Sequence, residues 1–289
     1  MSDPGEMALG LERERPGAPV SLPGAGLQGY TVPRTPLGQA SLVPPPPWHY
    51  VGDFLVVDFH ADPEVAASLL PEGLEPHPDA GRCAAVYADW QSCSEHGDEL
   101  VDPSRSHYRE FYIVVNALLD GEAVTTCPFI WVDQDFAMAR GWIQGFPKKL
   151  GEVWTTRTFG LECRAAPGLR TGSRFGGTCS ARGRAISRAN VTLDRVGDGS
   201  VHTAPPIVNV RHFPRLAAGR HDEPQIHELV RSRSRDRSVS DIWEGPAELE
   251  LYDAPGEEHT LLAPVSVERG YRFTFAYTVD DLETVKELG

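Results

Sequence analysis

The sequence predicts a mainly β protein of the α+β class, and three observations lead to that prediction. Short runs rich in Val, Ile, Thr, Tyr, Phe and Trp recur at near-regular spacing, which is typical of a β-barrel or a β-sandwich. Few stretches show helical periodicity. The chain has 289 residues, 40% of them hydrophobic and 24% charged, which suits one large globular domain or two small ones.

Composition argues against several classes of partner. The formal charge of -14 disfavours a nucleic-acid surface or an anionic membrane as the main partner. The start of the chain lacks a basic region followed by an apolar run, and no later run reaches the length of a membrane span. The five cysteines are an odd number without a Cys-x-x-Cys pair, and the ten histidines lack metal-ligand spacing. We therefore expect a cytoplasmic protein with no membrane, nucleic-acid or metal partner.

The N-terminal region precedes the predicted domain. Residues 1–27 are rich in Gly, Pro and Glu without a hydrophobic period, which predicts a flexible arm. Residues 28–48 remain Pro-rich and end in four consecutive prolines at 44–47, which favours an extended polyproline segment over a docking ligand. A single domain is expected over residues 28–289.

The first regular elements are a strand and a short helix. Residues 53–59 alternate in a way that indicates a strand. Asp62 and Pro63 then begin a short helix, because an aspartate cap followed by proline is a helix start signal. Pro71 and Gly73 end this region.

Further strands are predicted by β-branched and aromatic runs along the rest of the chain. Those before the middle of the chain cover residues 84–90, 110–117 and 124–132. Those after it cover residues 152–159, 176–181, 189–193, 207–210 and 248–252.

Two adjacent lysines stand in an otherwise apolar segment, residues 140–150. Lys148 and Lys149 are flanked by Trp142, Phe146 and other apolar side chains. Such a pair either occupies a solvated surface turn or is kept away from water for chemistry. An amine nucleophile has to be neutral, and both burial and a neighbouring cation favour the neutral form.

The segment Gly-Phe-Pro-Lys-Lys-Leu-Gly, residues 145–151, resembles the active-site signature of the acetoacetate decarboxylase family. Residues 61–75, with their Leu-Pro-Glu-Gly-Leu turn, resemble the same family a second time. The resemblance implies a closed antiparallel β-barrel with a few peripheral helices, and a homo-oligomer. It also implies that Lys148 forms a Schiff base, that Lys149 beside it tunes the amine, and that no cofactor is needed because the protonated imine is the electron sink.

Tyr108 and Glu110 form a second candidate group about forty residues before the lysines. In the family a Tyr-x-Glu occupies this place, and its glutamate belongs to the active site. The resemblance therefore implies that Glu110 moves protons and that Tyr108 donates to a carbonyl or alkoxide oxygen. From the residues themselves, an edge-strand tyrosine and a solvated glutamate is the alternative.

Departures from the family pattern indicate a branch with different chemistry. An arginine and a buried glutamate of the decarboxylases fall on Gly52 and Ala84 of this sequence. Arg140 and Gln144 instead resemble the branch that acts on pyruvate or other 2-oxo acids. Arg140 is suited to hold a carboxylate and Gln144 a carbonyl or hydroxyl, and a firmly paired carboxylate is less readily lost as CO₂.

We therefore expect a Schiff-base lyase that joins a 2-oxo acid such as pyruvate to an aldehyde and then removes water. The alternatives are an acetoacetate decarboxylase that uses the same lysine, and a non-catalytic barrel that binds a small acid. Release of CO₂ from acetoacetate would favour the first alternative, and the absence of a trapped lysine adduct would favour the second.

Arginine and serine alternate over residues 231–238. A period of two places Arg231, Arg233, Arg235 and Arg237 on one face of a strand. The tract resembles an arginine-serine RNA-binding segment, but it is short and is followed directly by a structured-looking segment, residues 242–246. A solvated face or a subunit interface that pairs with the abundant carboxylates is therefore favoured.

Overall fold

The computed structural model describes residues 26–198 and 205–289. Backbone contacts divide the chain into a unit of residues 1–42 and a unit of residues 43–289. In the first unit, Gln28 and Thr35 exchange two backbone hydrogen bonds of 2.8 and 3.0 Å. The predicted arm, residues 1–27, lies outside the described residues except for its last two positions, and the domain boundary after residue 27 stays a prediction.

The second unit is mainly β with few helices, as the sequence predicts. Its first half contains β1 (Trp48–His60), α1 (Pro63–Ser68), β2 (Glu75–Pro76), β3 (Arg82–Ser94), two 3₁₀ turns (Asp98–Val101 and Pro103–Arg105), β4 (His107–Leu119), β5 (Glu122–Val132), α2 (Asp135–Ile143), β6 (Lys148–Leu150) and β7 (Glu152–Thr155). Its second half contains β8 (Arg174–Ala181), β9 (Arg184–Thr192), β10 (Arg195–Val196), β11 (Val208–Pro214), β12 (Pro224–Val239), β13 (Trp243–Gly245), β14 (Ala247–Leu251), the 3₁₀ helix η4 (His259–Leu262) and β15 (Ser266–Glu287).

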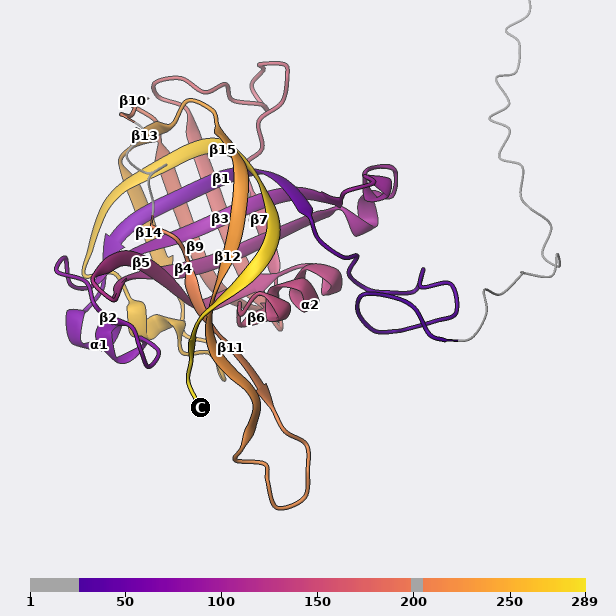
Figure 1. The fold of residues 1–289 in the computed structure, drawn as a ribbon. Helices are drawn as coiled ribbons and strands as arrows, with labels where there is room; N and C mark the ends of the chain where they lie inside the picture. The colour runs from indigo at the N-terminus through magenta and orange to yellow at the C-terminus, as the bar shows by residue number, and fades with distance from the viewer. Residues whose placement is uncertain (1–25, 199–204) are drawn as a thin grey trace, which may run out of the picture. The chain divides into compact units, whose positions relative to one another are not determined.

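Most strands belong to one large, strongly curved sheet (Figure 1). Its order is β10-β13-β15-β1-β3-β4-β5-β6, with β12 on β15, β11 on β12 and β2 on β4. The pairs are antiparallel except for β5 and β6. A single bridge from Thr125 of β5 to Ile207, just before β11, spans the gap that the named strand pairs leave open. Closure of the barrel therefore stays a prediction.

A smaller sheet of four strands, in the order β14-β9-β8-β7, packs against one face of the large sheet. As a result β1 is buried on both faces, which explains its apolar run. Leu55, Val57 and Phe59 point into the core between the sheets, together with Phe175 and Ile186 of the smaller sheet. The alternate residues of β1, such as Phe54 and Val56, point into the concave side of the large sheet.

The helices are short, and α1 begins where the sequence predicts, whereas the sequence pattern does not predict α2, which begins at Asp135. In α1 the side chain of Asp62 accepts hydrogen bonds from the backbone N–H groups of Glu64 and Val65 at 2.9 and 3.1 Å, and Pro63 opens the first turn. No helix in the described ranges is long and apolar enough to cross a membrane.

Each strand predicted from the sequence overlaps a strand of the structure, although β7 ends at Thr155 rather than at residue 159. The sequence pattern does not predict β15, a strand of 22 residues that pairs with β1, β12 and β13. The end of β15, from Asp280 to Glu287, is acidic and lacks a clear alternation, so its strand structure depends on pairing with β12 rather than on local preference.

Candidate active site

Lys148 is the first residue of β6, which a turn over residues 144–147 connects to helix α2. The helix ends at Ile143, the turn after it contains Gly145 with a positive φ of 81°, and Pro147 then prevents the helix from continuing. The strand runs parallel to β5, with Lys148 opposite Ile130. Trp142 of α2 donates its indole N–H to the Lys148 carbonyl at 2.8 Å, which ties the helix to the strand.

Glu110 and Trp90 complete a chain of hydrogen bonds around the lysine amine. Lys148 Nζ donates to Glu110 Oε2 at 2.8 Å, and Glu110 Oε1 accepts from Trp90 Nε1 at 2.8 Å. The side chains of Lys148 and Glu110 are only 8% and 7% exposed. A carboxylate at this distance can take the proton that an amine must lose before it attacks a carbonyl.

Tyr108 lies beside the same pair, two residues before Glu110 on β4. Lys148 Nζ is 5.2 Å from the centroid of its ring, and Trp90 stacks on that ring at 6.2 Å. Burial raises the pKa of the Tyr108 phenol well above its usual value. The phenol therefore stays protonated at neutral pH and can serve as a hydrogen-bond donor.

Gly141 lets helix α2 approach the lysine closely. A Cβ atom at this position would lie 2.3 Å from Lys148 Cδ and 2.6 Å from Cε. A side chain at position 141 would occupy the space of the lysine stem. Lys148 can therefore follow its observed path only because residue 141 is a glycine.

Arg140 is enclosed by aromatic rings. Its guanidinium carbon lies 4.7 Å from the ring centroid of Tyr50 and 5.6 Å from that of Tyr108. Its Nη2 atom donates to Ser92 Oγ at 3.0 Å, and the residue is 4% exposed. The structure thus brings Arg140 close to Tyr108, but Arg140 is not among the residues that line the neighbouring cavity.

Gln144, which follows the last residue of α2, does line that cavity. Its Oε1 atom accepts a hydrogen bond from Ser232 Oγ of β12 at 3.1 Å. Its Nε2 atom lies 3.5 Å from the Arg140 carbonyl, one helical turn back. The side-chain amide of Gln144 is therefore held between α2 and β12, where it forms part of the cavity wall.

Lys149 is the one predicted site residue that the structure does not bring to this group. Successive side chains of a strand point to opposite faces, so Lys149 points away from Lys148. Its ammonium pairs with Glu257 and lies 5.2 Å from the ring centroid of Trp131. Its role in tuning the amine stays a prediction.

A cavity of about 590 Å³ adjoins the lysine. Three neighbours of the Lys148–Glu110 pair, Trp90, Tyr112 and Phe146, belong to its wall, although Lys148 and Glu110 themselves do not. The centroid of the Phe146 ring is 5.8 Å from Lys148 Nζ, so the amine lies one side chain away from the cavity.

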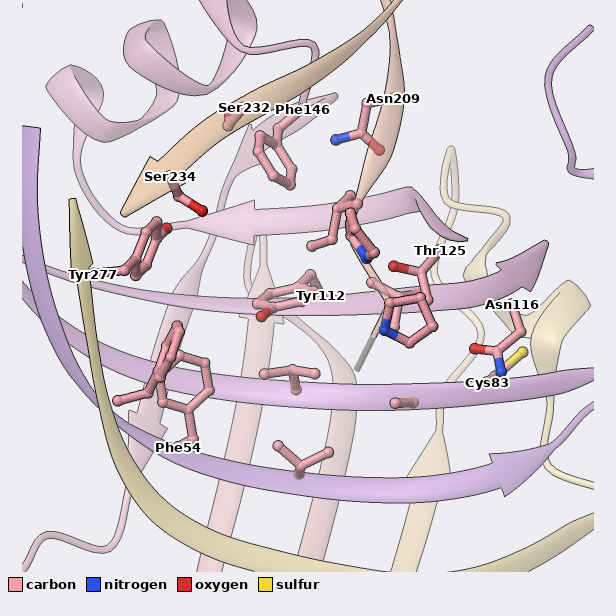
Figure 2. Close-up of a pocket in the computed structure, with 18 of the residues that line it drawn as sticks. Phe54, Cys83, Tyr112, Asn116, Thr125, Phe146, Asn209, Ser232, Ser234 and Tyr277 are labelled. Carbon is pink, nitrogen blue, oxygen red and sulfur yellow. The ribbon is translucent and has the colours of Figure 1, made fainter. Parts of the chain in front are cut away.

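The cavity is elongated (Figure 2). Ser234 and Tyr277 lie at one end, Tyr112 lies near the middle, and Asn116, Thr125 and Cys83 lie at the other end. Apolar side chains make up much of the wall between the two ends, which suits an organic ligand with separated polar groups.

The two positions at which the sequence departs from the decarboxylase pattern also lie here. A Cβ atom on Gly52 would be 2.6 Å from the indole ring of Trp90, so no larger side chain fits while Trp90 binds Glu110. Ala84 lines the cavity. Neither position supplies a charged group.

Trp90 and Ser92 are site residues that the sequence reasoning did not identify. Both lie on β3, and Trp90 is paired with Tyr108 of β4 across the sheet. The only local signal for Trp90 was its place at the end of a predicted strand, residues 84–90. A strand pattern does not show that the Trp90 indole forms a hydrogen bond with Glu110.

Comparisons with known proteins support these observations. The family model for acetoacetate decarboxylase matches residues 31–288. The solved structure titled enduracididine biosynthesis enzyme MppR complexed with pyruvate is 36% identical, with a TM-score of 0.84, and the match covers 92% of this chain and 100% of that one. A comparison with curated proteins gives no match.

Two further structures extend the comparison. The same MppR enzyme, complexed with the condensation product of pyruvate and imidazole 4-carboxaldehyde, is 36% identical with a TM-score of 0.85 and covers 92% of this chain and 99% of its own. An acetoacetate decarboxylase-like enzyme from Sphingomonas wittichii RW1 is 30% identical, with a TM-score of 0.83, over 90% of this chain and 100% of its own.

Proposed function

The chain belongs to the acetoacetate decarboxylase family, a family of enzymes, and from this premise we propose that it is a Schiff-base lyase acting on pyruvate or a related 2-oxo acid. It condenses this acid with an aldehyde and then removes water. The observation that carries the proposal is the buried Lys148–Glu110 pair beside a cavity of about 590 Å³. The MppR structures with pyruvate and with a pyruvate–aldehyde condensation product support the choice of substrates.

The first half of the reaction forms an enamine. Glu110 takes a proton from Lys148, and the neutral amine attacks the ketone carbon of pyruvate. The Phe146 ring lies between the amine and the cavity, so it has to move before pyruvate reaches the amine. The carbinolamine takes up a proton and loses water to give the protonated imine. Loss of a methyl proton then gives the enamine, with the imine nitrogen as the electron sink.

The second half forms and then dehydrates the new carbon–carbon bond. The enamine carbon attacks the aldehyde carbon, and the alkoxide oxygen takes a proton, for which the Tyr108 phenol beside the amine is the donor. Loss of a proton and of the hydroxyl as water gives a conjugated imine. Water then hydrolyses the imine, which releases the product and restores Lys148. No step requires a cofactor.

Gln144 and Arg140 orient the acid in this proposal. Gln144 lies on the cavity wall and is placed to meet the carboxylate or carbonyl first. Arg140, one helical turn behind it, contributes a permanent positive charge on the same side. With Gly52 and Ala84 uncharged, the site favours retention of the carboxylate over its loss as CO₂.

Reductive trapping tests the covalent step. Incubation with pyruvate and cyanoborohydride should add one pyruvyl group per chain on the peptide that contains Lys148, and Lys148→Ala should lose this adduct. Lys149→Ala is the matched control, because its amine lies on the other face of the strand. An adduct that forms equally in Lys148→Ala would rule out this nucleophile.

Product analysis tests the reaction class. The wild-type protein should consume pyruvate in the presence of an aromatic aldehyde and form an enone, while releasing little CO₂ from acetoacetate. Rapid release of CO₂ from acetoacetate, without enone formation, would instead favour the decarboxylase function.

A further inference from the structure

The four alternating arginines of β12 do not share one face of the strand. Arg231 and Arg233 pair with Glu283 at 3.1 and 3.6 Å, and Arg235 pairs with Asp280 at 2.8 Å. Arg237 lines the cavity, as does Arg231, but unlike the other three it has no ion pair within residues 26–198 and 205–289. The expectation that all four guanidiniums lie on one face of the strand is therefore wrong for Arg237, although its side chain is exposed, as expected for a solvated face.

A β-bulge causes the difference. Arg235 is opposite Thr278 and Ser238 is opposite Ala276, so Asp236 and Arg237 together oppose the single residue Tyr277. Asp236 has a positive φ of 53°, which accommodates the extra residue. Bulges re-aim side chains, and this one places Arg237 on the face that Tyr277 occupies.

Arg237 is held in place but is not neutralised. Its Nε and Nη2 atoms donate to Ser234 Oγ at 3.2 and 2.9 Å, and these are its hydrogen bonds in the described part of the chain. A guanidinium has five N–H donors, so further donors are free to bind a ligand. In a protein of formal charge -14, an uncompensated guanidinium in a cavity wall is a local point of attraction for an anion.

We propose that Arg237, positioned by Ser234, recognises a carboxylate carried by the aldehyde substrate, an inference that rests on the proposed function. The carboxylate of the 2-oxo acid is already assigned to Gln144 and Arg140 beside the lysine. The cavity of about 590 Å³ is in the range of pockets for ligands much larger than pyruvate. One unpaired guanidinium balances one negative charge, which favours a carboxylate, and its planar fork matches that group.

Binding of unreactive analogues tests the site without any chemistry at Lys148. Calorimetric titration should show that 4-(hydroxymethyl)benzoate binds the wild type at least about tenfold more tightly than benzyl alcohol. Arg237→Gln should remove this preference, whereas Arg235→Gln, an exposed arginine of the same strand that pairs with Asp280, should retain it. A preference that survives Arg237→Gln would overturn the proposal.

Kinetics then separate the two substrates. With pyruvate, kcat/KM for 4-carboxybenzaldehyde should exceed that for benzaldehyde, and Arg237→Gln should lower only the first value, by about tenfold or more. Arg237→Lys should restore part of the loss because it restores the charge.

The rate of pyruvate trapping should not change in Arg237→Gln, and a parallel loss of trapping would show that Arg237 holds pyruvate instead. If the wild type forms no pyruvate adduct, the proposed function fails, and the analogue titration still decides whether Arg237 binds a carboxylate.

Discussion

At the residue scale, the site depends on three side chains that are contributed by three strands. Lys148 of β6, Glu110 of β4 and Trp90 of β3 form one hydrogen-bonded chain. A buried carboxylate is stable only when its oxygens are paired, and here the ammonium and the indole N–H each satisfy one oxygen. Trp90 is thus a positioning residue for Glu110.

Trp90→Phe should weaken this arrangement while keeping most of the aromatic volume. Glu110 Oε1 would lose its indole donor, so we expect the free energy of unfolding to fall by about 1–3 kcal/mol. Pyruvate trapping should slow, with a larger effect on kcat than on KM, because Glu110 would no longer be held against Lys148. Chemical denaturation and trapping rates measure both effects, and Trp154→Phe at a 59% exposed position is the control. Unchanged trapping kinetics would assign Trp90 a purely structural role.

Lys149→Met should leave the pH dependence of pyruvate trapping unchanged, because the Lys149 ammonium pairs with Glu257 on the face opposite Lys148. The side chain of Glu257 is 5% exposed and would lose its partner, so the free energy of unfolding should fall by about 1–2 kcal/mol. Lys149→Arg should restore most of that stability. A pH profile that moves upward would instead support the tuning role predicted from the sequence.

At the scale of elements, α2 and β6 together determine where the nucleophile lies. The helix buries Phe136, Ala137, Arg140 and Gly141 on one side, and the turn that follows it, with Gly145 at a positive φ, leads the chain into β6. The helix and the strand are in contact at Gly141 and Lys148, so the position of α2 sets the position of the amine.

Gly141→Ala should therefore impair the site even though alanine favours a helix by about 1 kcal/mol over glycine. The added methyl group would lie 2.3 Å from Lys148 Cδ, which forces the lysine stem or the helix to move. We expect slower pyruvate trapping and no gain in melting temperature. Gly160→Ala adds a methyl group with no atom within 4 Å and should change neither quantity. A stabilised, fully active Gly141→Ala variant would contradict this packing argument.

At the scale of the whole second unit, the two sheets share a core that is closed partly by η4. His259 of this 3₁₀ helix is 1% exposed, and its Nε2 atom donates to the Ile186 carbonyl of β9 at 3.0 Å. Its ring lies 5.2 Å from that of Trp131 on β5. Burial lowers the pKa of His259 below its usual value of 6.5, so the neutral ring is the folded form.

This histidine should reduce stability in mild acid. Above pH 6.5 it is neutral in both the folded and the unfolded chain and has no effect. As the pH falls through 6.5, the unfolded chain binds the proton first, so the free energy of unfolding decreases until the folded pKa is passed. His259→Gln keeps an N–H donor for Ile186 but does not titrate, so it should lose less stability than the wild type between pH 7.5 and 5. Urea titrations over this range measure the difference, and parallel losses in both proteins would exclude His259 as the cause.

The sequence by itself determined the features that depend on local patterns. The β-rich class, the strands over residues 53–59, 84–90 and 110–117, and the start of α1 at Asp62 follow from alternation and capping signals within a few residues. The Gly-Phe-Pro-Lys-Lys-Leu-Gly and Tyr-x-Glu motifs were also sufficient to select Lys148, Glu110 and Tyr108, which the structure places within one group.

Only the tertiary structure decided which of these residues meet, and which others join them. Trp90 contacts Glu110 because of the register in which β3 and β4 pair. Lys149 lies outside this group because successive residues of β6 point to opposite faces, and its face is the one on which Glu257 lies. Arg237, an exposed residue, lines the cavity because of a bulge that depends on the pairing of β12 with β15. Register and bulges are set by contacts between residues far apart in the chain, so no short-range pattern in the sequence specifies them.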